Sequence, residues 1–439
     1  MVSQKEILLK GSVLKNAGWI IGCKILQSLI NLVIGVITAR YLGPGNYGVI
    51  SYVSSIVAFA LPIMQLGLKQ TLVKEFVQSP DQEGKILGTA ITINIISSIF
   101  CMIGCVSFVA LVDAGETETI LVCALYSLSL LFQATEMTQY WFQSKLLSKY
   151  PSIAALIAYT IVAVYKVYLL VTQKSIVWFA VSNVIDYFVI SIILIWIYRK
   201  VGGQRLTIDW GTGKGLLSRS KYYIIPSLMV MIFQHTDRIM IKLMIGEVET
   251  GFYSSAITCI GISSFVFSAV IDTARPVILE AKEHDEAQYE KRIIQLYSII
   301  TCMSLAQSIG MTLLAKPLVS LLYGSEYLGA AGILAIAVWY ITFGHYGTVR
   351  NIWILGESKQ RYLTGINVAG AIANVLLNLC LIPLWGAKGA AVASVVTQFF
   401  TNVIIGFVFP PIRRNNYFII KSLNPKIIAG VVQQALHRR

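Results

Sequence analysis

The feature that most restricts what this chain can fold into is a series of apolar stretches, each about 20 residues long, that recurs from one end of the sequence to the other. A helix of about 20 residues can cross the hydrocarbon core of a bilayer, which is about 30 Å thick. Hydrophobic residues make up 56% of the chain and charged residues only 13%, a composition that cannot cover a soluble surface. The sequence therefore predicts an all-α integral membrane protein.

Twelve transmembrane helices are expected, in two sets of six. The first set lies near residues 16–39, 46–66, 87–112, 118–143, 152–172 and 176–198, and the second near 222–245, 250–274, 293–314, 328–348, 362–383 and 387–410. The longest polar stretch separates the two sets. We therefore expect an N-terminal lobe at 1–199, a cytoplasmic linker at 200–221, a C-terminal lobe at 222–410 and a cytoplasmic tail at 411–439.

The positions of the basic residues predict the orientation in the membrane. A net charge of +14 could indicate a nucleic-acid-binding protein, but the basic residues lie between the apolar spans. The segments between the spans face the two sides of the membrane in turn. Of the 35 lysines and arginines, 27 fall in the segments on the same side as both termini, and only Arg40, Lys174, Lys316 and Lys388 fall in the loops on the other side. Because cytoplasmic loops retain basic residues, we expect both termini in the cytoplasm.

The loops and the metal-binding residue types argue against an enzyme and against a metal site. The outside loops are short, whereas membrane polymerases and ligases usually need a sizeable external loop for their catalytic groups. All seven cysteines lie within apolar spans, and the four histidines are scattered along the chain. We therefore expect no catalytic residue, no disulfide framework and no bound metal.

Two segments suggest an internal repeat. LGPGNYGVIS at 42–51 aligns with IGEVETGFYS at 245–254, and Gly43 and Gly48 align with Gly246 and Gly251. Both segments could simply be good short hairpins, but the shared spacing favours a duplication. Two halves of six spans would have the same orientation and be related by a pseudo-two-fold axis along the membrane normal, with a substrate cavity between the lobes.

Polar side chains within the predicted spans mark the candidate site. An ionisable residue at the bilayer centre costs about 2.5–3.5 kcal/mol, so it needs a partner, a water-filled cavity or a function. Neutral amides often only bond to neighbouring helices, whereas for the charged residues we favour a cavity. The candidate cavity residues are Lys24, Gln27 and Asn31 in the first span, Lys166 and Asp186 in the fifth and sixth, Gln234, Asp237, Arg238 and Lys242 in the seventh, and Asn374 and Asn378 in the eleventh.

The signs of these charges restrict the substrate. Lys166 and Asp186 could form a structural pair between adjacent helices or could contact substrate, and both interpretations stay open. The embedded cations outnumber the embedded acids, so a cavity lined by them would be net positive. A positive, wet cavity attracts phosphate and repels organic cations.

Several glycine-punctuated segments resemble one known family. These are NVLLNLCLIPLWGAKGAAVASVVTQ at 374–398, LYGSEYLGAAGILAI at 322–336, the TARYLGPGNYG turn, and FQHTDRIMIKLMIGEVETGFYSSA at 233–256. They resemble the polysaccharide transporter family of the multidrug, oligosaccharidyl-lipid and polysaccharide exporter superfamily. The resemblance covers most of the chain.

This resemblance implies two six-helix lobes around a V-shaped central cavity, as in multidrug and toxic compound extruders, and alternating access. It implies flipping of undecaprenyl-diphosphate-linked oligosaccharides, such as O-antigen units for lipopolysaccharide, between the leaflets of a bacterial inner membrane. No cofactor is expected, and a coupling ion, H⁺ or Na⁺, is left open. The implied partners are the lipid-linked oligosaccharide and membrane lipid, with polysaccharide polymerase and chain-length proteins as further candidates.

The alternative function is a multidrug or metabolite cation antiporter of the same superfamily. Such a protein would favour an acidic residue in the first span, where this chain has Lys24. A membrane polymerase or ligase is disfavoured because the outside loops are short.

Overall fold

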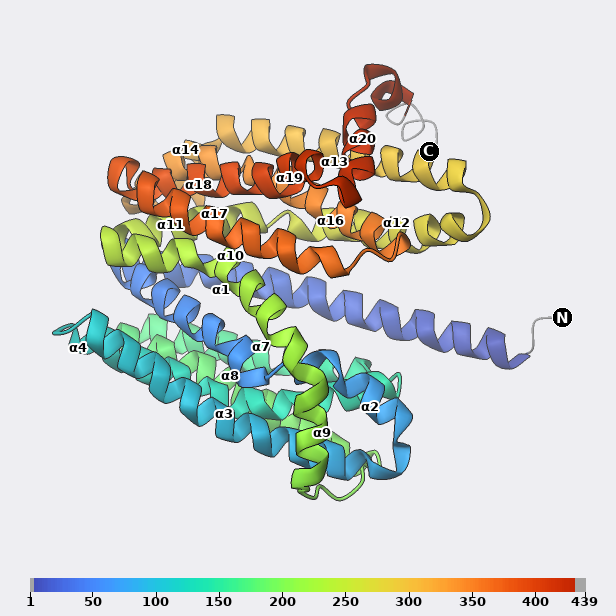
Figure 1. The fold of residues 1–439 in the computed structure, drawn as a ribbon. Coiled ribbons are helices and arrows are strands. Elements are labelled where there is room, and N and C mark those ends of the chain that lie inside the picture. The colour runs from blue at the N-terminus through green and yellow to red at the C-terminus, as the bar shows by residue number, and fades with distance from the viewer. Residues whose placement is uncertain (1–3, 431–439) are drawn as a thin grey trace. The chain divides into compact units, whose positions relative to one another are not determined.

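The computed structural model describes residues 4–430, with side chains from residue 22 onward except that of Lys24. All regular elements within residues 4–430 are helical, as the sequence predicted (Figure 1). The chain divides into two compact units. Unit 1 comprises Met1–Leu42 and Val49–His235, and unit 2 comprises Gly43–Gly48 and Thr236–Arg439. Unit 1 therefore includes the 200–221 segment and the first part of helix α10, where the sequence analysis placed a linker and the start of the second lobe.

Unit 1 is built around one aromatic core. Phe76, Trp141, Phe142 and Tyr198 are buried in it, and the Trp141 and Tyr198 rings meet edge to face at 4.7 Å. Its elements are most of α1 (Gln4–Gln65), α2 (Leu72–Gln78), α3 (Glu83–Val112), α4 (Thr117–Ser127), α5 (Ser129–Gln133), η3 (Ala134–Met137), α6 (Thr138–Ser144), α7 (Lys149–Val171), α8 (Ile176–Lys200), α9 (Trp210–Ser220) and the start of α10 (Ile224–Met244).

Unit 2 has its own core, in which Tyr289, Tyr297, Trp353 and Phe418 are fully or almost fully buried. Its elements after α10 are α11 (Glu247–Gly261), α12 (Ser264–His284), α13 (Glu286–Leu313), α14 (Ala315–Tyr323), α15 (Gly329–Ala337), α16 (Tyr340–Gly356), α17 (Arg361–Trp385), α18 (Ala387–Phe399), the π-helical turn η6 (Phe400–Ile404), α19 (Ile405–Val408) and α20 (Arg413–Ser422).

The helices match most of the predicted spans. Within the described part of the chain, nine helices are long and apolar enough to cross a membrane, or ten if α11 and α12, which are bent by 42°, form one span. Gly43 interrupts α1 with φ 70° and divides its apolar part into two segments. α10, where the seventh span was predicted, is not among these nine or ten helices, so the count of twelve spans stays a prediction.

The repeated glycines have matching roles. Gly43 and Gly246 both adopt positive φ, 70° and 122°, which favours glycine. Gly48 and Gly251 face each other's segment: a Cβ at Gly48 would lie 1.8 Å from the Glu247 carbonyl oxygen, and one at Gly251 would lie 1.9 Å from that of Pro44. The two copies therefore pack against each other reciprocally within unit 2, which favours a duplication over two unrelated hairpins.

The segment before α9 is fixed to the start of α3. The Thr207 amide donates to the Gly84 carbonyl at 3.3 Å, and the Asp209 amide donates to the Thr89 hydroxyl at 3.0 Å. Asp209 then caps α9 by accepting from the Thr212 amide at 2.7 Å. The predicted linker is thus an ordered strap on unit 1.

Candidate functional site

Asp237 on α10 is only 6% exposed and accepts hydrogen bonds from three other helices. Its Oδ2 accepts hydrogen bonds from the Tyr253 hydroxyl on α11 and from the Ser394 hydroxyl on α18. Its Oδ1 accepts from Asn378 Nδ2 on α17 at 2.6 Å. One buried carboxylate therefore ties four helices together, and we call these residues with Asn374 the Asp237 cluster.

The spacing of the asparagines explains their place in this cluster. Asn374 and Asn378 are four residues apart, so they lie on one face of α17, and both are buried. Asn378 Nδ2 also donates to Asn374 Oδ1 at 3.2 Å. Asn378 Oδ1 is buried and has no hydrogen-bond partner among the described residues. A buried acceptor in this state is costly unless a ligand or water meets it.

Two cations flank the cluster on α10. Arg238 Nε donates to the Ser254 hydroxyl on α11 at 3.2 Å. Lys242 lies four residues after Arg238, on the same helix face, and is 6% exposed. The structure therefore places Asp237, Arg238, Lys242, Asn374 and Asn378 in one unit, and their role in binding stays a prediction.

The chemistry of the cluster is that of a single carboxylate with hydroxyl and amide neighbours. Among the described residues, no group of three or more His, Cys, Asp or Glu side chains could hold a metal ion. The hydroxyls of Tyr253 and Ser394 can rotate to donate to a carboxylate or to offer lone pairs to a cation. The cluster could therefore bind a proton or one small hard cation.

Unit 1 contains a second group of embedded ionisable residues. Asp186 on α8 interacts electrostatically with Lys166 on α7, yet among the described residues neither makes an ion pair within 4.0 Å. Asp186 Oδ1 is buried without a hydrogen-bond partner in this part of the chain. Glu136 on η3 also interacts electrostatically with Asp186. A direct Lys166–Asp186 bridge, one of the two interpretations, is therefore not formed in this structure.

The remaining predicted residues do not form one visible site. Gln27 on α1 donates from Nε2 to the Ser152 carbonyl on α7 at 3.2 Å, so it connects two helices of unit 1. Asn31 and Gln234 are exposed. The side chain of Lys24 lies outside the described residues, so its predicted role is unchanged.

Arg350 is a buried cation that sequence reasoning missed. It lies two residues past the predicted end of the span at 328–348, but α16 continues to Gly356, and Arg350 is only 4% exposed. One guanidinium nitrogen donates to the Thr401 carbonyl at 2.7 Å, within the π-helical turn η6. π-turns frequently occur at functional sites. The available signal was the apolar helical pattern that continues through the buried Val349 and Trp353.

Tyr253 and Ser394 were also missed. They are neutral hydroxyls, which are common in membrane helices and carry no sequence signal until a structure places them against a carboxylate.

Comparison with known proteins gives one family and one fold. A family model described as a polysaccharide biosynthesis protein matches residues 37–332. The capsular polysaccharide biosynthesis protein CapF of Staphylococcus aureus is 21% identical over 397 residues, which cover 88% of this chain and 96% of CapF. The probable low-salt glycan biosynthesis flippase Agl15 of Haloferax volcanii is 22% identical over 225 residues, 48% of this chain. That match spans only 47% of Agl15.

Two solved structures share the fold. The lipid II flippase MurJ in an inward closed conformation superposes with a TM-score of 0.71 at 14% identity, covering 92% of this chain and 90% of MurJ. An inward-facing multidrug transporter of the MATE family superposes with a TM-score of 0.70 at 13% identity, covering 89% of this chain and 95% of that transporter. The predicted MATE-like helical fold is confirmed.

Proposed function

The chain belongs to the polysaccharide biosynthesis protein family, and from that premise we propose that it flips undecaprenyl-diphosphate-linked oligosaccharides across a bacterial inner membrane. The substrate would be an O-antigen unit or a similar surface polysaccharide unit, moved from the cytoplasmic to the outer leaflet. Both termini would lie in the cytoplasm. A polymerase and chain-length proteins would act on the unit after it reaches the outer face.

The observation that carries this proposal is the sign of the charge buried in unit 2. Lys242 and Arg350 are buried, whereas Asp237 is the only buried carboxylate among the described residues of that unit. Arg238, beside Asp237, adds a further partly buried cation. An interior with excess positive charge suits a diphosphate, which accepts hydrogen bonds from arginine and attracts lysine as a point charge.

Flipping requires no catalytic residue, because no covalent bond forms or breaks. The physical difficulty is to carry sugar hydroxyls and a diphosphate past hydrocarbon without leaving them unsatisfied. Embedded amides and cations replace part of the hydration shell of the headgroup, while the polyprenyl chain stays in lipid. We infer that Arg238 and Lys242 serve the diphosphate in this way, with Lys24 as the corresponding residue of the first span.

We further propose that the Asp237 cluster binds the coupling ion. Its carboxylate can take up a proton, or its oxygens can surround a monovalent cation once Asn378 Oδ1, now unpartnered, turns to face that ion. Because Asp237 joins α10, α11, α17 and α18, neutralising its charge would weaken the contacts among those helices. Ion binding and helix movement would then be linked through one side chain.

The alternative, a cation antiporter, draws its support from unit 1. In that unit Asp186 and Glu136 interact electrostatically with each other. Asp186 also interacts electrostatically with three phenol side chains, those of Tyr126, Tyr159 and Tyr187. Carboxylates and aromatic rings together are a suitable site for an organic cation.

The experiment that separates these functions is complementation of bacterial strains that each lack the flippase for one defined surface polysaccharide. Restored polysaccharide in one strain, at a membrane level equal to that of the native flippase, is the expected result. A protein that restores none of them, yet raises resistance to cationic drugs, would favour the antiporter. The matched control is Glu283→Gln, at an exposed acid remote from the Asp237 cluster in the sequence.

A further inference from the structure

A cavity of about 570 Å³ lies in unit 2, apart from the predicted substrate residues. It is formed by the start of α13 and by the chain from α20 to Gly430. Three lysines line it, Lys291, Lys421 and Lys426, together with the apolar side chains of Ile294 and Ile427. It therefore combines basic groups with an apolar wall.

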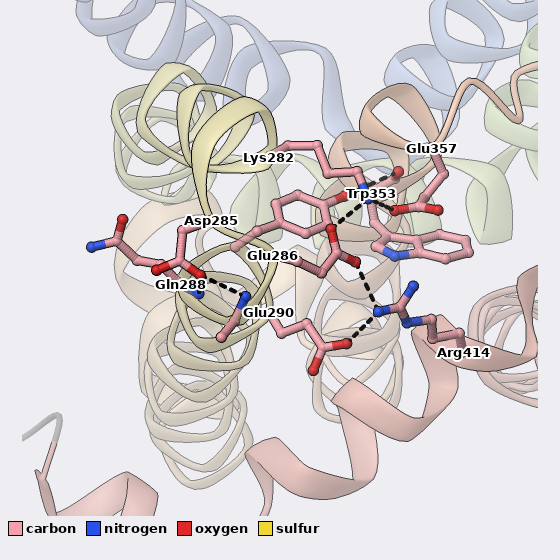
Figure 2. A network of polar contacts seen from close by, with 10 residues as sticks. Lys282, Asp285, Glu286, Gln288, Glu290, Trp353, Glu357 and Arg414 are labelled. Atoms are coloured by element: carbon pink, nitrogen blue, oxygen red, sulfur yellow. Dashed lines mark hydrogen bonds and ion pairs between the residues drawn. The ribbon is translucent and has the colours of Figure 1, made fainter.

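The positive charge of this cavity is not compensated by its own acid. Glu290 is the only acidic residue lining it among the described residues. Figure 2 shows that the Glu290 carboxylate points to Arg414, whose Nη2 lies 2.6 Å from Glu290 Oε1 and 2.8 Å from Glu286 Oε1. The same network continues to Lys282, which pairs with Glu286 at 2.8 Å and with Glu357 at 2.6 Å. Glu290 is thus already neutralised, and it fixes α20 to α13.

None of the three cavity lysines makes an ion pair within 4.0 Å in the described part of the chain. Lys421 has an aromatic neighbour instead: its Nζ lies 4.3 Å from the centre of the Tyr417 ring. Three lysines around one opening repel each other, and an anion placed among them relieves that repulsion. The charge of the cavity therefore suits an anionic ligand.

The helix beside the cavity indicates where the anion comes from. In Figure 1, α20 runs across the direction of α13 and α19 and not along it, as a helix lying in the plane of a membrane surface would. Tyr417, Ile420 and Leu423 follow one another at three-residue spacing and are each about half exposed. In a membrane such an apolar stripe would enter the boundary between headgroups and acyl chains, and the neighbouring lysines would then lie at the level of the lipid phosphates.

We propose that this cavity binds the headgroup of an anionic phospholipid from the leaflet that faces the cytoplasm. The proposal relies on the orientation given under the proposed function, but not on flipping. Lys291, Lys421 and Lys426 contact the phosphate, Ile294 and Ile427 pack against the glycerol and upper acyl carbons, and the bound lipid holds α20 against α13.

The test is a titration of the purified full-length protein in dodecyl maltoside, followed by the shift in its thermal unfolding midpoint. The probes are dioctanoyl phosphatidylglycerol, dioctanoyl phosphatidylcholine and glycerol 1-phosphate. We expect saturable stabilisation by phosphatidylglycerol alone. Replacing all three lysines by glutamine should weaken apparent affinity about 100-fold, because each lysine near an anionic headgroup contributes roughly fivefold.

Two matched variants control this result. The triple lysine-to-arginine variant keeps the charge and should retain binding even if the glutamine variant is less stable. Glutamine at Lys74, Lys214 and Lys221, three exposed lysines of unit 1, makes the same charge change elsewhere and should leave the affinity unchanged. An unchanged affinity in the cavity glutamine variant would overturn the site. Equal stabilisation by glycerol 1-phosphate would overturn the lipid as its ligand. Because no transport is measured, either outcome leaves the flippase proposal untouched.

Discussion

Replacing Asp237 by asparagine tests whether the buried carboxylate holds unit 2 together. The change removes the charge but keeps the side-chain size, so the effect is electrostatic. Tyr253, Ser394 and Asn378 each donate to this carboxylate. Asn378 can turn its unpartnered Oδ1 toward the new amide, so the hydrogen bonds persist as neutral ones.

The magnitude follows from those three bonds. A hydrogen bond to a charged group contributes about 1.5–3 kcal/mol, against about 0.5–1.5 kcal/mol for a neutral one. If each of the three hydrogen bonds weakens by about 1 kcal/mol, unit 2 loses roughly 3 kcal/mol of stability. Hydrogen bonds between membrane helices contribute less, about 0.6 kcal/mol on average, which lowers the expected loss toward about 2 kcal/mol. We expect a loss of about 2–3 kcal/mol.

The assay is unfolding by sodium dodecyl sulfate in mixed micelles, followed by labelling of Cys259 with a thiol-reactive fluorophore. Cys259 is buried in α11, so its labelling reports the opening of unit 2 once the other cysteines are replaced by alanine. Glu283→Gln, at an exposed acid, is the control and should stay within about 0.5 kcal/mol of the parent. An Asp237→Asn protein that unfolds with the parent's midpoint would refute the reasoning.

Three further outcomes are expected. Gly251→Ala should sharply reduce the amount of folded protein, because its Cβ would lie 1.9 Å from a backbone oxygen, whereas Gly35→Ala, with nothing within 4 Å, should not; folded yield after detergent extraction measures this. Arg350→Met should cost about 1–3 kcal/mol in the same unfolding assay, because the Thr401 carbonyl loses its side-chain donor, and an unchanged midpoint would contradict this role. Hydrogen bonds from Thr212 and the contact with Lys85 lower the pKa of Asp209 from 3.8 to about 2. The Asp209 carboxylate therefore stabilises the strap fully above pH 3.8, and this stabilisation is lost as the pH falls toward 2. The protection factors of amides 204–212, which correct for the intrinsic pH dependence of amide exchange, should therefore fall over that interval in the parent, and an Asp209→Asn protein showing the same fall would be inconsistent with this carboxylate as its cause.

The sequence was sufficient to predict where most helices lie, because the membrane imposes a length and a composition on every span. It also identified the roles of the repeated glycines, since Gly43 and Gly246 adopt positive φ and Gly48 and Gly251 sit at close backbone contacts. Helix ends next to water were harder to predict. α12 and α16 both run past their predicted ends, because polar residues such as Lys282 continue a helix once they find partners.

The candidate site was predictable only in part. Asp237 and Asn378 stood out because polar residues in apolar spans are conspicuous, and the structure joins them at 2.6 Å. Tyr253 and Ser394 could not be chosen, since a hydroxyl's partner depends on which helix lies opposite. The sequence left open whether Lys166 and Asp186 form a bridge, because adjacent helices allow the pair but side-chain packing decides whether the charges meet.

The most direct test of the central claim is flipping by the purified protein in liposomes. An undecaprenyl-diphosphate-linked oligosaccharide that carries a fluorophore on its sugar is placed in both leaflets, and dithionite, which does not cross the membrane, is added outside. The account predicts that dithionite quenches the inner pool as well in liposomes that contain the protein. The same sugar on a polyprenol that lacks the diphosphate should remain protected. Protection of the diphosphate-linked sugar by a folded protein, or equal flipping of both lipids, would contradict the account.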